Sequence, residues 1–114
     1  HSETLRVGKP TLSALIGDRK GVEVWTVHGA ALQAAGVMPG DVVVVDLAEV
    51  PRAGDIVCAE IHEQGGLRTI FRLYQKPYLV QATFAAGTWM PIVVDDRNVI
   101  VRGVVTDRIA GRRT

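Results

Sequence analysis

Few residues in this sequence could serve as a catalytic nucleophile or as the base that activates it. The serines are Ser2 and Ser13, and the lysines are Lys9, Lys20 and Lys76. A serine hydroxyl can attack a carbonyl when a neighbouring lysine has lost its proton, which a desolvated amine does near neutral pH. Ser13 and Lys76 could form such a pair, but nothing in their spacing supports it.

The cysteine and the histidines show no pattern of a metal site. Cys58 lies in the apolar run 56–59, where a small buried residue is expected, and a single cysteine excludes an internal disulfide. His28 and His62 have no cysteine, carboxylate or histidine at metal-ligand spacing, so we interpret them as surface or strand residues. The sequence therefore predicts no metal and no cofactor.

The charge balance argues against direct binding of nucleic acid. The formal net charge is +1, and a protein that neutralises many phosphates normally carries a basic field. The short cluster Arg108, Arg112 and Arg113 is expected to be a solvated tail. There is no apolar run of the roughly 18 residues that a membrane span needs and no signal peptide, which together with the single cysteine predicts a cytoplasmic protein.

The elements that position these residues are predicted to be strands. Hydrophobic residues make up 47% of the chain and aromatic residues only 5%, and the apolar runs are rich in β-branched side chains. Residues 22–27 alternate apolar with polar side chains, whereas the uninterrupted valines of 42–46 indicate a strand buried on both faces. Further strands are expected near Thr4–Gly8 and at 56–62, 67–74, 77–83 and 98–109, with irregular structure over 85–97.

Turn residues divide the chain between these strands. Residues 30–35 favour one short helix, and Gly36 could take the left-handed conformation that ends it. Asp41, Asp46 and Asp55 begin or end strands, where capping of turns explains them. We expect an arm or linker at 1–21, one domain at 22–110 and a tail at 111–114, the length being enough for a single core.

Three segments resemble one known family. The residues from Val27 to Asp41 resemble the nucleophile segment of the LexA and UmuD self-cleaving peptidases, in which valine, any residue and glycine lead to a serine and then to a Gly-Asp turn. Residues 54–59 and 91–95 resemble later segments of that family in the same order. The resemblance implies the LexA C-terminal-domain fold, a mostly β, curved sheet assembly with one short helix near residues 30–35. It places Ala31 at the serine position.

The same resemblance places no residue that could act as a base at the position of the family's catalytic lysine. One register places Phe71 there, and the ungapped register places Arg68 there. Phenylalanine has no titratable group, and arginine stays protonated with a pKa above about 12. A methyl group at Ala31 cannot attack a carbonyl, so the resemblance predicts a pseudo-peptidase with an apolar cleft and no catalytic residues.

Two explanations of Ala31 stay open. The alanine could be natural, or it could be a substitution installed at a catalytic serine to trap an uncleaved precursor. Because loss of one member already disables a cooperative catalytic pair, the missing lysine favours the natural explanation. The arm also lacks the Ala-Gly or Cys-Gly dipeptide that the family cleaves upstream of its nucleophile.

Without the catalytic pair, the function that the resemblance still implies is association between copies of the domain. The family dimerises in part by pairing its C-terminal strands, and the matching segment here carries the predicted dimerisation residues Val99, Val101, Gly103, Val105 and Asp107. We therefore expect a regulatory and dimerisation domain of a bacterial or phage repressor, with homodimers, an antirepressor as a further partner, and DNA bound through an upstream domain. The alternatives are a self-cleaving peptidase inactivated at Ala31 and an accessory subunit of a translesion polymerase.

Overall fold

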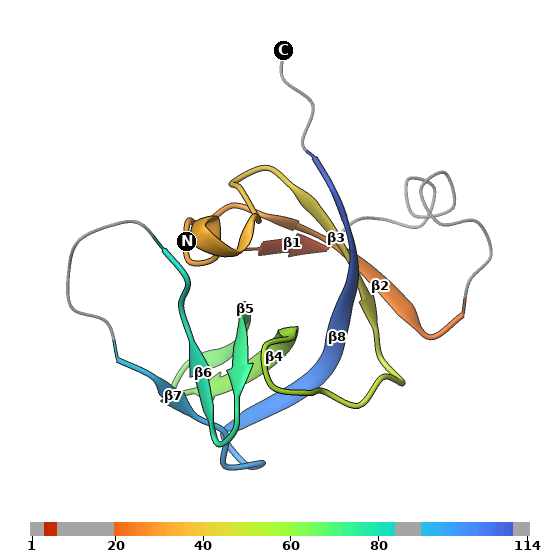
Figure 1. Cartoon of the computed structure of the whole chain (residues 1–114). Coiled ribbons are helices and arrows are strands. Elements are labelled where there is room, and N and C mark those ends of the chain that lie inside the picture. The colour runs from red at the N-terminus through yellow and green to blue at the C-terminus, as the bar shows by residue number, and fades with distance from the viewer. Residues whose placement is uncertain (1–3, 7–19, 84–89, 111–114) are drawn as a thin grey trace.

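The computed structural model describes residues 4–6, 20–83 and 90–110 (Figure 1). These residues form one sheet in which every strand pair is antiparallel, in the order β1-β2-β3-β8-β4-β5-β6-β7. One 3₁₀ helix, η1, accompanies the sheet. The elements are β1 (Thr4–Arg6), β2 (Val22–Val27), η1 (Gln33–Ala35), β3 (Val42–Asp46), β4 (Ile56–Glu63), β5 (Gly66–Gln75), β6 (Tyr78–Val80), β7 (Ile92–Val93) and β8 (Val99–Ile109).

The last strand joins the two halves of the sheet. Residues 104–109 of β8 pair with β3, and residues 99–104 pair with β4. In β8, Arg102 has no partner residue in the pairing with β4, and Thr106 has none in the pairing with β3. Each is therefore the extra residue of a β-bulge. A bulge bends its strand and increases the local twist, and Figure 1 shows β8 curving from the β4–β7 group to the β1–β3 group.

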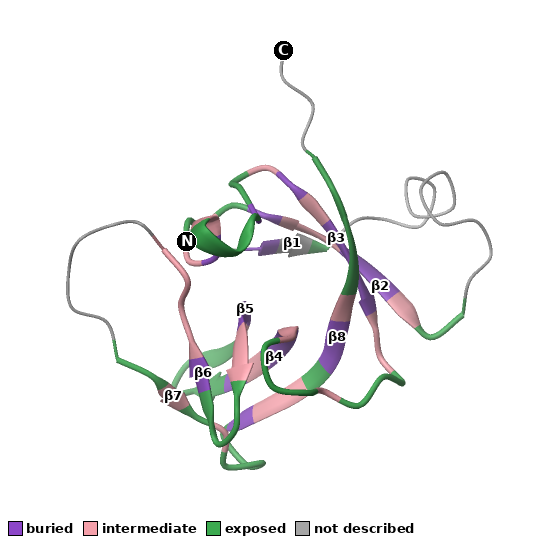
Figure 2. Cartoon of the chain, in the orientation of Figure 1, coloured by how far each residue is buried: buried purple, intermediate pink, exposed green. Residues whose placement is uncertain are grey.

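Two hydrophobic clusters fill the halves of the curved sheet, and Figure 2 shows the buried residues along the strands that contain them. The first cluster contains residues of β2, β3 and the loop after β2, together with one residue each of β4 and β5, and the second contains residues of β4, β5, β6 and β8. Their buried members are Val27, Leu32, Val37, Val43, Val45, Cys58 and Phe71 in the first, and Val57, Ala59, Ile61, Ile70, Leu79, Val99 and Val104 in the second.

The predicted mostly β fold is confirmed, with differences at the ends of elements. The strand over 22–27, the buried strand over 42–46 and the hairpin around residues 64–65 all form. The expected strand at 77–83 is shorter, 78–80, and β7 lies within 85–97, which was predicted to be irregular. β7 has only two residues, which are too few to show an alternation of apolar and polar side chains in the sequence. Residues 84–89 lie outside the described part.

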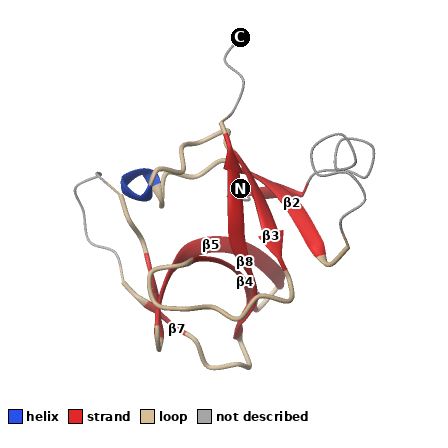
Figure 3. Ribbon diagram, turned by 45° about the vertical axis from the view of Figure 1, so that its right-hand side comes forward, coloured by secondary structure: helices blue, strands red, loops and turns tan. Residues whose placement is uncertain are grey.

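The short helix and the arm each differ in one respect. The helix is a single 3₁₀ turn, and Gly36 after it has the expected left-handed φ of 90° (Figure 3). Thr4–Arg6 of the expected arm pairs with β2 and so belongs to the sheet. The rest of the arm to residue 19 and the tail 111–114 are not described. No helix among the described residues is long and apolar enough to cross a membrane.

Candidate functional site

Ala31 and Phe71 line the same small pocket, although they are far apart in the sequence. The pocket has a volume of about 190 Å³, including the space at its mouth. It lies among β1, the end of β2, the loop that follows β2, and β5. Its lining residues are Thr4, Val27, Gly29, Ala31, Leu32 and Phe71.

Backbone hydrogen bonds fix the loop that carries Ala31. At the neck of the loop, the Gly40 amide donates to the Val27 carbonyl at 2.6 Å, and the Val27 amide donates to the Asp41 carbonyl at 2.9 Å. The carbonyl of Ala31 accepts from the Ala82 amide at 2.7 Å. The position that the family resemblance gives to serine is therefore held between the end of β2 and the segment after β6.

The carboxylate of Asp41 holds the other end of this loop. Its Oδ2 accepts from the Met38 amide at 2.9 Å and from the Arg108 guanidinium at 3.1 Å. Because Arg108 lies on β8, this contact ties the loop of Ala31 to the C-terminal strand. Asp46 and Asp55 also accept from backbone amides, of Ala48 and Arg52, so the predicted capping by all three carboxylates is confirmed.

The walls of the pocket are apolar. The Phe71 ring is buried and packs edge-on against Trp25, with ring centroids 6.2 Å apart. Among the described lining side chains, the Thr4 hydroxyl is the polar group, and it donates to the Thr69 carbonyl at 3.4 Å. The lining offers neither a titratable base nor an activated hydroxyl, which agrees with the prediction of an apolar cleft.

Arg68 occupies a different place from Phe71. It lies near the tip of the β4–β5 hairpin, opposite Ile61, and its guanidinium pairs with Glu63 at 2.9 Å. It does not line the pocket of Ala31. Of the two registers that the sequence left open, the geometry therefore favours the one that puts Phe71 at the lysine position.

The other reactive side chains are placed as structural or surface groups. Cys58 is buried, and burial together with the nearby Glu23 carboxylate raises the pKa of its thiol to about 12. A thiol with so high a pKa carries almost no thiolate at neutral pH. His28 and His62 are exposed, and Nε2 of His62 lies 3.4 Å from Glu60 Oε1. Within the described ranges, no three His, Cys, Asp or Glu side chains converge as metal ligands.

The serines and most of the predicted basic cluster fall outside the described residues. Ser2, Ser13, Lys9, Arg112 and Arg113 are among those that the structure does not describe. Lys20 and Lys76 are exposed on turns. The structure therefore does not test the Ser13–Lys76 pair, which the sequence did not support either.

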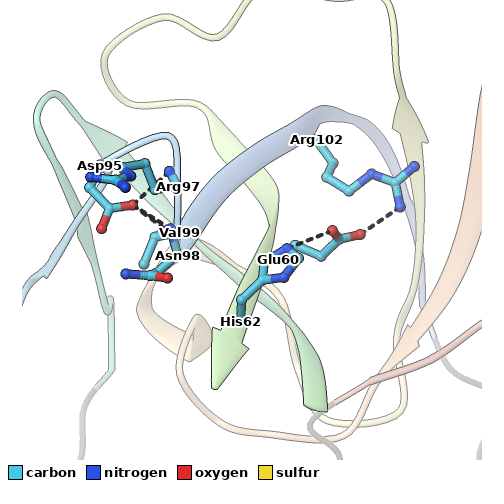
Figure 4. Close-up of polar contacts among 7 residues, drawn as sticks. All are labelled: Glu60, His62, Asp95, Arg97, Asn98, Val99 and Arg102. Carbon is cyan, nitrogen blue, oxygen red and sulfur yellow. Dashed lines mark hydrogen bonds and ion pairs between the residues drawn. The ribbon is translucent and has the colours of Figure 1, made fainter. Parts of the chain in front are cut away.

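Sequence reasoning missed the cap before β8. Asp95 Oδ1 accepts from the amides of Arg97, Asn98 and Val99 at 2.8–2.9 Å (Figure 4). These hydrogen bonds, that of Val99 foremost, hold the pKa of Asp95 below its usual value. An Asp followed by Asp, Arg and Asn between two apolar runs is a turn signal that could have shown this cap.

Sequence reasoning also missed a network of charges on the strands. Arg102, the bulged residue of β8, donates to Glu60 Oε2 at 2.9 Å (Figure 4) and lies 4.0 Å from Glu23 Oε2. The same Glu23 oxygen pairs with Arg6 of β1 at 3.2 Å. Positions 6, 23, 60 and 102 share no local pattern, because their proximity depends on the order of the strands.

The predicted dimerisation residues do not share one face of β8. Val99 and Gly103 are buried, and Val101 and Val105 are half-buried against the two hydrophobic clusters. Asp107 is exposed. The bulges break the alternation of side chains along β8, and dimerisation through these residues stays a prediction.

The sequence matches a known family and part of several curated proteins. A family model described as "Peptidase S24-like" matches residues 2–106. "Protein ImpA" of Salmonella typhimurium and that of Escherichia coli are each 49% identical over 49 residues, which cover 43% of this chain and 32% of the relative. This chain thus matches about a third of the length of these relatives.

Proposed function

The chain belongs to the peptidase S24-like family, the family of LexA and UmuD, and from that membership we propose that it is a non-catalytic member. Its role would be that of a LexA-like regulatory and dimerisation domain in a bacterial or phage transcriptional repressor. DNA would be bound by another domain of the parent protein, and protein partners such as an antirepressor would act through this one.

The observation that carries this proposal is the shared pocket of Ala31 and Phe71. Self-cleavage needs a hydroxyl and an unprotonated amine within hydrogen-bonding reach of each other. Where this chain brings the two resembling segments together, it supplies a methyl group and a phenyl ring. Restoring the hydroxyl alone would leave it without a base, so one substitution should not create a peptidase.

The test is to restore the serine and the lysine one at a time. We expect the unmodified chain, Ala31→Ser and Phe71→Lys to stay intact on incubation at alkaline pH, with chain length followed by mass spectrometry. Ala30→Ser is the matched control, because it adds the same hydroxyl at an exposed neighbouring position. Cleavage of Ala31→Ser but not of Ala30→Ser would overturn the proposal and support a peptidase whose serine has been replaced.

Dimerisation is proposed through the C-terminal end of β8. Residues 105–109 pair with β3 on one side, and no described strand pairs with them on the other. Residues 106–109 are exposed, as Figure 2 shows at that end of the strand. An open strand edge is a template for pairing with a second copy, so backbone pairing here fits a twofold dimer.

Light scattering over a range of concentrations tests this dimer. Ile109, which is 37% exposed, would become Ile109→Lys, and the control Val50→Lys changes an apolar side chain that is 74% exposed and lies off β8. We expect Ile109→Lys to raise the dimer Kd about tenfold or more, since it places like charges at the pairing edge. A monomer at every concentration for the unmodified chain would contradict the dimer.

The role of an accessory subunit of a translesion polymerase remains the second candidate. The parent gene discriminates between the two roles. A helix-turn-helix segment encoded beside this domain would support the repressor, and its absence there would support the accessory subunit.

A further inference from the structure

One ion pair joins the loop that carries Ala31 to the C-terminal strand. Oδ2 of Asp41 lies 3.1 Å from the Arg108 guanidinium. The side chain of Asp41 is 6% exposed and that of Arg108 is 45% exposed, so the guanidinium reaches a buried carboxylate from the surface. The same carboxylate oxygen accepts from the Met38 amide at 2.9 Å. One buried oxygen atom therefore contacts both the loop and β8.

On the loop side, Asp41 forms part of the neck of the segment that carries Ala31. Its carbonyl accepts from the Val27 amide at 2.9 Å, and the Gly40 amide donates to the Val27 carbonyl at 2.6 Å. The neck and the carboxylate that binds Arg108 thus belong to one residue. A displacement of the loop that opens this neck also moves the acceptor of the guanidinium.

On the strand side, Arg108 lies at the edge proposed for dimerisation. It directly opposes Val43 of β3, a buried member of the first cluster, so it lies on the face of β8 that this cluster covers. No described strand pairs with residues 105–109 on the other side. Asp107, the neighbouring acidic residue, points to the opposite face, because successive side chains of a strand alternate. On its own face of β8, the Arg108 charge is therefore offset by Asp41.

Pairing of two copies at this edge would bring their Arg108 side chains together. Residues 106–109 are exposed. A twofold pairing centred on residue 107 or 108 places the two Arg108 positions diagonal or opposite to each other, about 5–8 Å apart. That separation is within the Debye length of about 8 Å at physiological ionic strength, so two guanidinium groups without a carboxylate would repel each other. A carboxylate of Asp41 beside each guanidinium offsets this repulsion.

We propose that the ion pair between Asp41 and Arg108 couples the loop of Ala31 to dimerisation at β8, an inference that rests on the dimer proposed above. While the neck is closed, Asp41 offsets the charge of Arg108 and the edge can pair. When the loop opens, the guanidinium loses its carboxylate and pairing weakens. Coupling between two sites is reciprocal, so dimerisation also holds the loop closed. A protein that binds the open loop would thereby dissociate the dimer without cleavage of the chain.

A double-mutant cycle on the dimer Kd tests the coupling. Asp41→Asn keeps an oxygen acceptor for the Met38 amide and removes the charge beside Arg108. We expect it to raise the Kd about tenfold, measured by light scattering. In an Arg108→Met background, which has no charge to offset, the same substitution should change the Kd less than about twofold. The matched control is Asp46→Asn, because Asp46 caps the Ala48 amide at the other end of β3, and its Kd should not change.

The outcomes separate the coupling from the dimer itself. A rise in Kd for Asp41→Asn that disappears in the Arg108→Met background supports the coupling. An unchanged Kd for Asp41→Asn, or an equal rise in both backgrounds, overturns the coupling and leaves the dimer in place. An unmodified chain that is monomeric at every concentration overturns both proposals.

Amide hydrogen exchange gives a second test that needs no change at Asp41, should Asp41→Asn fail to fold. The Met38 amide is bound by Asp41, and the Ala48 amide is bound by Asp46. We expect the Met38 amide to exchange about tenfold more slowly in the dimer than in the monomeric Ile109→Lys variant, as followed by NMR. The Ala48 amide should exchange at the same rate in both. Exchange of Met38 that is no slower in the dimer would show that dimerisation does not act on the loop, and the proposal would be wrong.

Discussion

Gly103 offers the sharpest test of how β8 passes between the two half-sheets. Its Cα lies so close to β3 that a Cβ atom built there would be 2.6 Å from Val45 Cγ1 and 2.7 Å from the Asp46 carbonyl oxygen. Carbon atoms in folded proteins do not approach backbone oxygen so closely. Gly103→Ala therefore forces β3 and β8 apart, because the backbone oxygen cannot be moved by changing a rotamer.

The expected cost follows from these two contacts. Overpacking a well-filled interior costs about 1–3 kcal/mol, and a clash with backbone belongs at the upper end, about 3 kcal/mol. With a urea dependence of about 2 kcal/mol per molar, the unfolding midpoint should fall by about 1.5 M. Circular dichroism in urea measures this shift.

Gly54→Ala is the comparison. Gly54 has no atom near its absent Cβ, but its φ is 90°, so alanine there costs about 1 kcal/mol of backbone strain. Gly103→Ala should destabilise clearly more than Gly54→Ala. Equal midpoints would refute the close approach. A variant of unchanged stability that no longer dimerises would instead favour the interface role predicted for Gly103 from the sequence.

Four further outcomes are expected from burial, charge and packing. The pKa of Asp95 is lowered in the folded protein, so the ionised carboxylate stabilises the fold at pH values above the ordinary pKa of an aspartate. Asp95→Ala should therefore lower the urea midpoint at pH 7. The difference in midpoint between the variant and the unmodified chain should vanish as acid protonates the carboxylate. Because the pKa of Cys58 is raised to about 12, a thiol reagent at pH 8 should react with it only after unfolding, as a colorimetric assay would show. Asp41→Ala removes the buried acceptor of the Arg108 guanidinium and the Met38 amide, so it should lower the free energy of unfolding by about 3 kcal/mol. Asp46→Ala should lower it by about 1 kcal/mol, and urea unfolding measures both changes. Phe71→Ala should cost about 3–5 kcal/mol and alter tryptophan fluorescence, whereas an unchanged midpoint would contradict its packing in the first cluster.

Local patterns made much of the fold predictable. Alternation over 22–27 marks β2, because side chains of a strand repeat every two residues, and the uninterrupted valines of 42–45 mark β3 as a strand buried on both faces. The capping by Asp41, Asp46 and Asp55 was likewise visible, since such caps act within a few residues. These features depend on neighbours in the sequence, which a single sequence displays.

Contacts between distant strands could not be predicted in the same way. Phe71 reaches the pocket of Ala31 only once the sheet has curved, and the sequence left Arg68 as an equal choice. The bulge at Arg102 breaks the two-residue period, so Val101 and Gly103 do not lie on the same face of β8, which the residue types alone did not indicate. Bulges leave no residue-type signature comparable to an Asp cap.

The position of β8 in the sheet sets the order in which the chain can complete its fold during synthesis. Its neighbours β3 and β4 are made long before it, and the contact between Asp41 and Arg108 spans 67 positions. Until the ribosome releases the last strand, β3 and β4 each lack one pairing partner and present open edges. Folding dominated by such distant pairings is slow, and a stop codon before Val99 would remove the strand that pairs with both β3 and β4.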